Sequence, residues 1–443
     1  MIVILLLQPI RTIIDTKRPV AMKYKTAKMR IIVNAGLPYY LIYDFIRVHS
    51  VKYATPSDAE VLSRETNVSH DAPKPYAPKY IFIVQVESLN ASIINYRVAG
   101  KEVTPFLNRL TTSAYFFPNM FANHLLGSAD ADFSTLTSLL PQDSQLTYNY
   151  SLKHLPSLPR FLREQGMKTY VFQPLRGSFF NYENAYKQMG VEKYYGRDYF
   201  TQKGDGWDVR DSDFFNASLS IIEKKIAQGE TGLFYLITIP SHGPYRNHSH
   251  SLLSKDEMKK IASNSADHQS LTETILHYFN TIHETDAALR ELYETITTKS
   301  WAKESLLLIF GDHVMEEGAI PIYDSRNGFP ATLENIPLFV CLPTEKGRVI
   351  SSPVAHVDIA PTIAYLLGYT DNKYWSGQNV FATQEMKQVI VNNQQGVFIN
   401  KDEIYFKNGT TYSFNNKKKI ENRSVNHNKR IEEIGRASCR ERV

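Results

Sequence analysis

Cysteine is almost absent from this chain of 443 residues, which has only Cys341 and Cys439. Two cysteines supply neither a disulfide framework nor a cysteine-rich zinc site. The net charge is also small, because 50 Lys and Arg residues oppose 45 Asp and Glu residues. This balance gives no basic surface of the kind that nucleic-acid binding needs, so we expect no nucleic-acid partner.

Long apolar runs are lacking as well. The first ten residues, MIVILLLQPI, are mostly apolar, but they provide about half of the ~20 residues that a membrane-spanning helix needs. Residues 31–53 mix aromatic and basic side chains, which is typical of a segment at a membrane interface, although an ordinary packed helix is the alternative. We therefore predict that residues 1–53 are a membrane-proximal segment, which could be the remainder of a truncated membrane domain.

Changes in composition divide the rest of the chain. Residues 54–79 are polar and contain prolines, which predicts a linker. Residues 80–381 alternate apolar runs with helical patterns and should form the main globular domain. Residues 382–415 are predicted to form a small antiparallel subdomain, residues 416–432 a basic solvated tail, and residues 433–443 an adapter-derived artefact of cloning.

Short continuous apolar runs indicate strands that are covered on both faces, as in a parallel sheet. Helical patterns lie between these runs: Thr104 and Pro105 fit the N-cap and first position of one helix, and residues 271–296 carry an apolar stripe. We therefore predict an α/β fold with a mostly parallel central sheet, helices on both faces and a small C-terminal antiparallel meander. The runs are YIFIVQV, KTYVFQP, LFYLITI, LLLIF and PLFVCL.

Polar residues that can bind a cation follow three of these runs. Glu87 follows the first, His242 comes shortly after LFYLITI, and Asp312 and His313 follow LLLIF and Gly311, where we expect the backbone to turn. The carboxyl ends of parallel strands share one edge of a sheet, where ligands gather. Carboxylates and an imidazole suit Mn²⁺, Zn²⁺ or Mg²⁺. The alternative is that each residue only makes a turn or a helix cap.

The stretch GSADADFSTLTSLLP contains a candidate nucleophile. Ser128 is in the N-cap position of a predicted helix, and Asp130 and Asp132 lie in the first turn, where the helix dipole favours negative charge. A hydroxyl at a helix N-terminus beside a divalent cation can attack phosphorus. The alternative is that Ser128 is merely a cap, and the sequence does not show whether it lies near Glu87.

Several stretches, taken together, resemble the lipoteichoic acid synthase-like phosphoglycerol transferases of the sulfatase and alkaline phosphatase superfamily. The resemblance covers about residues 78–385 and implies a metal-dependent enzyme with the fold of that superfamily. The stretches are VQVESLN, FFPNMFANHLLGSADADF, ITIPSHGPY, LHYFNTIHETDAALREL, IFGDH and HVDIAPTIAYLLG.

The resemblance also assigns roles to particular residues. It implies one divalent metal, with Mn²⁺ favoured over Mg²⁺ and Zn²⁺, and a nucleophilic hydroxyl on Ser128. Its metal ligands map to Glu87, Ser128, Asp312 and His313, and its head-group contacts map to Trp207, Arg210 and His242.

Two features depart from the family pattern. The family nucleophile is usually threonine, whereas this chain has Ser128. Sulfatases convert a Cys or Ser to an aldehyde within a motif that has Pro or Ala two residues later and Arg four residues later. Ser128 is followed by ADAD, so we do not expect that modification.

The function implied is transfer of a phosphoglycerol head group from phosphatidylglycerol to an envelope acceptor through a phospho-Ser128 intermediate. Arg210 would hold phosphate oxygens and His242 would protonate the leaving alkoxide. The expected partners are a phospholipid head group and the membrane surface, with residues 80–381 as the catalytic domain on the extracytoplasmic (periplasmic) side of a bacterial cell membrane.

One alternative function is that of a phosphodiesterase or sulfatase-like ester hydrolase that uses the same site. Another is a non-catalytic envelope-binding protein.

Overall fold

The computed structural model describes residues 37–38 and most of residues 69–420. The predictions for residues 1–36, 39–68 and 421–443 lie outside the described residues, and the predicted domain boundaries stay predictions. Among the described helices, none is both long and apolar enough to cross a bilayer. The gaps within 69–420 are 126, 142–146, 150, 203, 246–250, 264–271, 316–328, 330–332, 344, 370–374, 383–387, 392–396 and 407–409.

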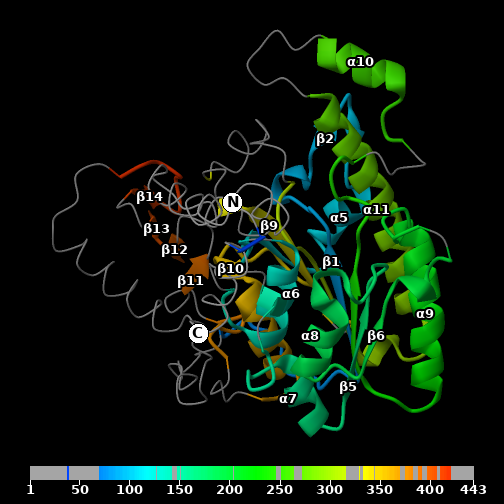
Figure 1. Ribbon diagram of the computed structural model, residues 1–443. Coiled ribbons are helices and arrows are strands. Elements are labelled where there is room, and N and C mark those ends of the chain that lie inside the picture. The colour runs from blue at the N-terminus through cyan, green and yellow to red at the C-terminus, as the bar shows by residue number, and fades with distance from the viewer. Residues whose placement is uncertain are drawn as a thin grey trace.

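An eight-stranded sheet forms the centre of the described structure (Figure 1). Its strand order is β10-β4-β9-β8-β1-β7-β5-β6, and β9 alone runs antiparallel to its two neighbours. The prediction of a mostly parallel sheet is therefore confirmed. The strands are β1 (Tyr80–Val86), β4 (Tyr115–Phe121), β5 (Lys168–Phe172), β6 (Lys193–Tyr195), β7 (Gly232–Ile237), β8 (Ser305–Gly311), β9 (Asn335–Cys341) and β10 (Val354–Ala355).

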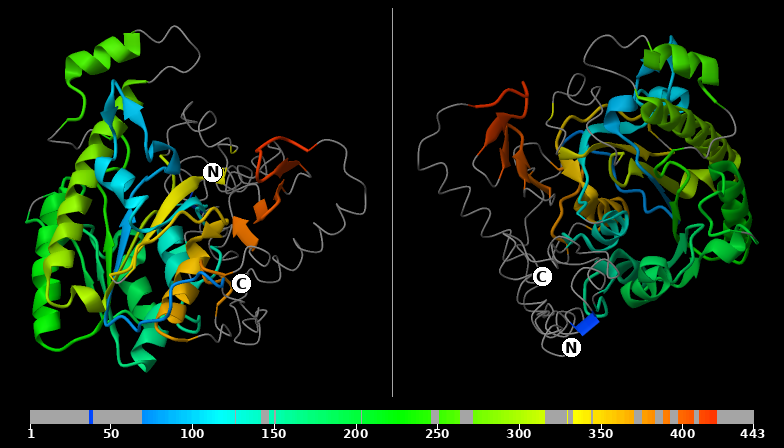
Figure 2. Two further views of the ribbon diagram at one scale, coloured as in Figure 1. Left: turned by 180° about the vertical axis from the view of Figure 1, so that it is seen from behind. Right: turned by 45° about the horizontal axis from the view of Figure 1, so that its top comes forward.

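Helices cover both faces of this sheet, as predicted (Figure 2). The side chains of β1 alternate between the two faces: Phe82 and Val84 join one apolar cluster, whereas Ile81 and Ile83 join the other. The first cluster includes side chains of α5 (Pro105–Leu110), α9 (Asp211–Ala227), α10 (Lys255–Ser263) and α11 (Glu273–Thr298). The second includes side chains of α6 (Ala129–Thr137), α7 (Leu158–Glu164), α8 (Tyr182–Met189) and α13 (Ile359–Leu366).

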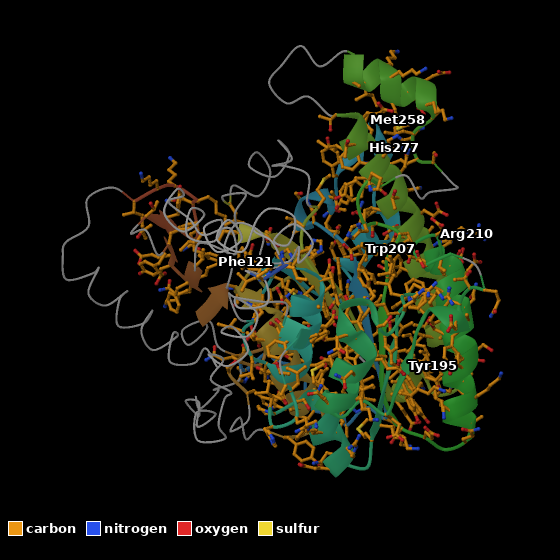
Figure 3. All side chains as sticks on the ribbon, viewed as in Figure 1. Phe121, Tyr195, Trp207, Arg210, Met258 and His277 are labelled. Carbon is orange, nitrogen blue, oxygen red and sulfur yellow. The ribbon has the colours of Figure 1, made fainter. Side chains whose placement is uncertain are left out.

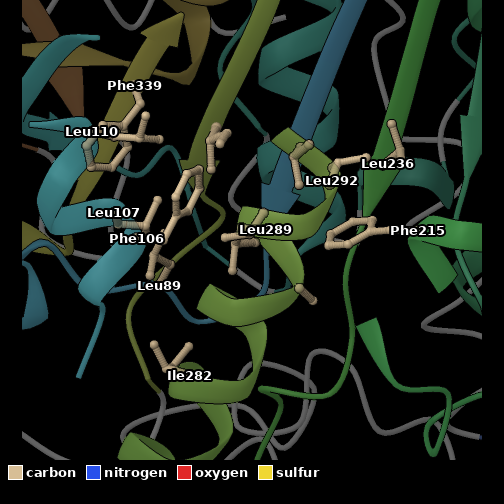
Figure 4. Packing of buried hydrophobic residues seen from close by; sticks show 14 of the residues in the cluster. Leu89, Phe106, Leu107, Leu110, Phe215, Leu236, Ile282, Leu289, Leu292 and Phe339 are labelled. Carbon is tan, nitrogen blue, oxygen red and sulfur yellow. The ribbon is translucent and has the colours of Figure 1, made fainter. Parts of the chain in front are cut away.

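The long helix α11 is the centre of the first cluster. Figure 4 shows Leu289 and Leu292 of α11 between Leu107 of α5 and Phe215 of α9. The predicted apolar stripe is confirmed, because six of its seven positions are buried and the seventh, position 271, lies outside the described residues. The buried six are Ile275, Tyr278, Ile282, Leu289, Leu292 and Ile296.

A second, four-stranded antiparallel sheet follows near the C-terminus, which confirms the predicted meander. Its strands are β11 (Gln388–Val391), β12 (Val397–Asn400), β13 (Glu403–Phe406) and β14 (Thr411–Ser413). Ile399 and Ile404 are buried in an apolar cluster that also contains Phe121 of β4 and Val357. The small sheet therefore packs against the end of the main sheet. A short antiparallel pair, β2 (Arg97–Val98) and β3 (Lys101–Glu102), completes the described strands.

The start of α5 is capped by another helix. Thr104 occupies the predicted N-cap position, but its side chain does not cap the helix. Its hydroxyl instead lies 2.9 Å from Asn108 Oδ1 and 3.3 Å from the carbonyl oxygen of Ile93, both of which can accept its proton. The carboxylate of Asp286, on α11, accepts hydrogen bonds from the main-chain amides of Phe106 (2.8 Å) and Leu107 (2.9 Å). These amides have no partner within their own helix, so Asp286 both caps α5 and fixes it to α11.

We expect Asp286→Ala to lower the free energy of unfolding by about 2 to 4 kcal/mol, because two buried amides lose their acceptor. Asp286→Asn keeps one acceptor oxygen and should lose about half as much. Glu291→Ala is the matched control, since Glu291 is exposed on the same helix. Urea unfolding followed by circular dichroism gives the three values. Equal stability of the Asp286→Ala and Glu291→Ala variants would show that the cap contributes nothing.

Candidate active site

The carboxyl ends of β1, β7 and β8 lie side by side, because β1 pairs in parallel with both other strands. Glu87 follows β1, and Asp312 and His313 follow β8. The loop after β7 holds the main chain of Glu87: its N–H donates to Thr238 Oγ1 (3.1 Å), and Ser241 Oγ donates to its carbonyl (2.6 Å). The expected convergence of these strand ends is thus present.

Two backbone features bring the loops after β1 and β8 into contact. Ser88 has a φ of +55°, a left-handed conformation that costs energy for a residue with a side chain, and its N–H donates to Asp312 Oδ1 at 2.8 Å. Gly311 is the last residue of β8, and a Cβ atom there would lie 2.4 Å from the carbonyl oxygen of Leu89. The expectation that Gly311 serves a turn is therefore wrong, because its role is to allow this close approach.

Helix α6 places Ser128 beside the strand ends. Ser128 occupies the N-cap position, but its side chain makes no capping hydrogen bond. Its Oγ lies 3.2 Å from Glu87 Oε2 and 3.3 Å from His313 Nε2. The structure therefore answers the question that the sequence left open, since Ser128 and Glu87 share one site.

The four candidate ligands have the spacing that one small cation requires. His313 Nε2 lies 3.3 Å from Glu87 Oε1 and 3.4 Å from Asp312 Oδ2. Four donors at about 2.1 Å from one tetrahedrally coordinated ion are about 3.4 Å apart. Within the described part of the chain, Glu87, Asp312 and His313 are the one group of acidic and histidine residues whose ligand atoms are close enough for a metal ion, within 4.8 Å of one another.

Hydrogen bonding leaves one oxygen of Asp312 and one nitrogen of His313 available to a cation. Asp312 Oδ1 accepts from the amides of Ser88 and His313, whereas its buried Oδ2 accepts no hydrogen bond. His313 Nδ1 lies 2.7 Å from the carbonyl oxygen of Val314, which can only accept, so this nitrogen carries the proton. In the neutral ring, Nε2 then offers a lone pair to the same space as two carboxylates. The residues therefore fit a divalent cation, with the Val314 carbonyl fixing the imidazole tautomer.

Charge interactions within the cluster shift the pKa values of all three residues. Burial would lower the pKa of His313, but Asp312 and Glu87 outweigh it and raise this pKa well above its ordinary value. Burial and the charge of Glu87 raise the pKa of Asp312 to about 7. Burial would raise the pKa of Glu87, but the charges of His313 and His242 contribute to lowering it. The cluster therefore needs positive charge, and a proton on His313 can supply it.

A pocket of about 510 Å³ opens at the end of β7. Trp207 and His242 both line it, with their rings edge to face and their centroids 4.9 Å apart. Phe179 also packs against Trp207, with a centroid distance of 5.6 Å. Two of the three predicted head-group residues therefore share one pocket. Its remaining lining residues are Asp208, Ile239, Pro240, Gly243 and Pro244.

Arg210 is not among the residues that line this pocket. It lies at the N-cap position of α9 (Figure 3), and its guanidinium pairs with Asp213 on the same helix at 2.8 Å. Both side chains are about half exposed, and such a pair contributes little energy. A phosphate contact would require Arg210 to turn away from Asp213, so its predicted role stays a prediction.

His124 and Glu334 adjoin the site but were not found from the sequence. The ring of His124 stacks on that of His313 with centroids 4.6 Å apart, and its Nδ1 lies 3.0 Å from a carboxylate oxygen of Glu334. Burial would lower the pKa of His124, but Glu334 outweighs it and raises this pKa. His124 follows β4, a strand that the apolar pattern does not show because Pro118 lies at an irregularity in its pairing. Recognition of β4 would have made His124 a candidate.

His356 supports the site from behind. Its Nε2 donates to the carbonyl of Gly311 at 2.9 Å, and its Nδ1 accepts from the amide of Asn123 at 3.0 Å. Burial lowers the pKa of His356 to about 4, so the ring is neutral near pH 7. It therefore joins the ends of β8 and β4 without adding charge.

Residues 79–369 match the sulfatase family. Lipoteichoic acid synthase 2 of Bacillus subtilis is 24% identical over 407 residues, which cover 85% of this chain and 60% of that protein. Lipoteichoic acid synthase of Staphylococcus aureus is 29% identical over 381 residues, which cover 80% of this chain and 55% of that protein. The chain thus spans between half and two thirds of the length of these curated relatives.

Two solved structures have the same fold. One is a lipoteichoic acid synthase from Listeria monocytogenes, with a TM-score of 0.68 and 21% identity over 90% of this chain and 95% of that chain. The other is an alkaline phosphatase superfamily protein from Vibrio parahaemolyticus, with a TM-score of 0.67 and 18% identity over 90% of this chain and 92% of that chain. The central sheet and its helices are therefore a known arrangement.

We expect Mn²⁺ binding to release protons and to weaken as the pH falls. Without the ion, His313 keeps its proton up to a pH well above its ordinary pKa, and the ion must displace that proton. Below the pKa of His313, affinity should fall about tenfold per pH unit for each displaced proton. Calorimetric titration in two buffers with different ionisation heats counts the protons released.

Two variants provide the controls for this titration. His313→Ala should lose both the affinity and the proton release, whereas His154→Ala, which changes an exposed histidine, should keep both. An Mn²⁺ affinity that does not change across the neutral pH range would contradict the assignment of His313 as a ligand.

Proposed function

Because the chain belongs to the sulfatase family, we propose that it transfers a phosphoglycerol head group from phosphatidylglycerol to an acceptor of the cell envelope. The observation that carries this proposal is the position of Ser128 Oγ, at a helix N-terminus and within 3.3 Å of both Glu87 and His313. The relatives are named lipoteichoic acid synthases, which supports a lipoteichoic acid-like component of the envelope as the product class. The donor follows from the resemblance of the sequence to phosphoglycerol transferases.

Glu87, Ser128, Asp312 and His313 would hold the metal ion. When bound, a divalent cation lowers the pKa of a neighbouring hydroxyl and balances negative charge on phosphoryl oxygens. Mn²⁺ prefers oxygen ligands, so a site with three oxygen donors and one imidazole suits Mn²⁺ better than a site rich in sulfur or nitrogen does. The N-terminus of α6 adds the positive end of its dipole at the same place.

In the proposed first step, Ser128 Oγ attacks the phosphorus atom of phosphatidylglycerol. The Oγ–P bond forms as the bond from phosphorus to the diacylglycerol oxygen breaks, and the hydroxyl proton of Ser128 passes to solvent water. The leaving oxygen needs a proton, and His242, whose Nδ1 lies 2.9 Å from the carbonyl of Gly243, donates it from Nε2. In the second step an acceptor hydroxyl attacks the phosphorus of phospho-Ser128 and passes its proton to His242. The Oγ–P bond breaks, and Ser128 Oγ takes up a proton from water, which restores the free hydroxyl.

The pocket at the end of β7 has a lining that suits a small polyol. Trp207, Ile239 and Pro240 give it apolar walls that can contact the carbon chain of glycerol. Asp208 adds a carboxylate that can accept hydrogen bonds from glycerol hydroxyls. The lipid donor implies that this face meets the membrane surface, and we propose the extracytoplasmic side of the membrane as its place.

We expect Ser128→Ala to lower the release of diacylglycerol from phosphatidylglycerol in the presence of Mn²⁺ by about 10³-fold or more, because it removes only the attacking oxygen. Ser128→Thr should keep part of the activity, since the hydroxyl survives. Ser134→Ala is the matched control, because Ser134 lies on the same helix and its buried hydroxyl has no hydrogen-bond partner.

Intact-protein mass spectrometry provides the second readout. The parent, incubated with phosphatidylglycerol and no acceptor, should gain the mass of one phosphoglycerol group, and the Ser128→Ala variant should not. Parent-like release by Ser128→Ala would remove Ser128 from the mechanism. Release of free glycerol phosphate without any transfer to an added glycolipid would instead favour the hydrolase alternative.

A further inference from the structure

Gln85 is a polar residue in the middle of a buried strand. It follows Ile81 and Ile83 on the face of β1 that packs against α6, and it is completely buried. A buried amide is stable only when its donors and acceptors have partners. Gln85 Nε2 donates to Asp132 Oδ1 at 2.6 Å, and its Oε1 accepts from the hydroxyl of Tyr235.

Asp132 completes this network from α6. Its second oxygen, Oδ2, accepts from the hydroxyl of Tyr186 at 2.7 Å, so each carboxylate oxygen has one donor. Its main-chain N–H donates to the carbonyl of Ser128 at 3.3 Å. Asp132 was expected only to complement the helix dipole, but its side chain is buried and connects the first turn of α6 to β1 and α8.

These contacts form a closed path through the active site. Ser128 is bonded through its carbonyl to Asp132, and Asp132 is bonded to Gln85. Glu87 is two residues beyond Gln85 on the same chain, and its carboxylate lies 3.2 Å from Ser128 Oγ. The bond between Asp132 and Gln85 therefore joins α6, which begins after Ser128, to β1, which ends just before Glu87.

We propose that Asp132 and Gln85 are positioning residues, which hold the Ser128 hydroxyl against Glu87 for attack on phosphorus. The proposal rests on the proposed function, and it extends that function to two residues that touch neither substrate nor metal. Displacement of a nucleophile by about 1 Å can cost about 10²-fold in rate, so the effect of losing the bond should be large.

The polarity of the hydrogen bond provides the test. Asp132→Asn leaves one acceptor oxygen for two donors, Gln85 Nε2 and the hydroxyl of Tyr186, and Gln85→Glu places a carboxylate opposite that of Asp132, so each single change disrupts the network. The double change, Gln85→Glu with Asp132→Asn, reverses the bond, because the new amide can donate to the new carboxylate. The hydroxyls of Tyr235 and Tyr186 keep an acceptor oxygen in this double variant.

Each single variant should lower kcat for diacylglycerol release by at least about tenfold with little change in KM, and the double variant should recover to within about threefold of the parent. Burial raises the pKa of Asp132 to about 7, although its hydrogen bonds from Tyr186 and Gln85 lower it, so assays above neutral pH keep it ionised.

Asp286→Asn is the control, since it makes the same change at a buried aspartate on the opposite face of the sheet. It should lower stability but not kcat at a temperature where the protein is folded.

The proposal is overturned if the double variant is no more active than the single variants, or if the single variants lose only thermal stability, as Asp286→Asn should. Calorimetric Mn²⁺ titration of the same variants keeps the test independent of turnover. Ser128 and Glu87 are expected to bind the same ion, so each single change should weaken Mn²⁺ binding by at least about threefold and the double change should restore it. If the parent binds Mn²⁺ but releases no diacylglycerol, the proposed function fails while this affinity series still decides the positioning role.

Discussion

Repulsion between two buried carboxylates is the constraint around which the site is built. Glu87 and Asp312 are almost inaccessible to solvent and lie at the ends of neighbouring parallel strands, and an imidazole nitrogen of His313 is directed between them. Such an arrangement is stable only when positive charge lies among the three groups. In the protein alone a proton on His313 provides it, and a divalent cation would provide it more completely.

The surrounding structure holds these groups together at an energetic cost. Ser88 adopts a left-handed backbone conformation so that its amide reaches Asp312, and Gly311 is the one residue small enough for its place beside Leu89. The two faces of the sheet differ in how they contribute. On the face of α11 a buried aspartate, Asp286, caps a helix, whereas on the face of α6 a buried aspartate, Asp132, connects that helix to Gln85 of β1 and Tyr186 of α8. Each face of the sheet thus has its own buried carboxylate that ties a helix to its neighbours.

The sequence predicts the strand ends well, because continuous apolar runs mark buried strands and the next polar residue marks where each run ends. Glu87, Asp312 and His313 follow from that pattern. The proximity of Ser128 does not, because it depends on how α6 packs on β1, which is a tertiary contact. His124 was missed because Pro118 interrupts the apolar pattern of the strand before it. Asp286 was missed because the amides that it binds, those of Phe106 and Leu107, are about 180 residues away along the chain. Gln85 could have been recognised as unusual from the sequence, because it is the one amide side chain within the apolar run YIFIVQV.

The central claim is that one divalent cation joins Glu87, Ser128, Asp312 and His313 in a single site. Anomalous diffraction from a crystal soaked in Mn²⁺ measures this directly, because the peak locates the metal independently of the protein. We predict one peak, about 2.0 to 2.3 Å from an oxygen or nitrogen atom of each of the four residues. Two peaks in the cleft, or one peak out of contact with Ser128 Oγ, would contradict the claim.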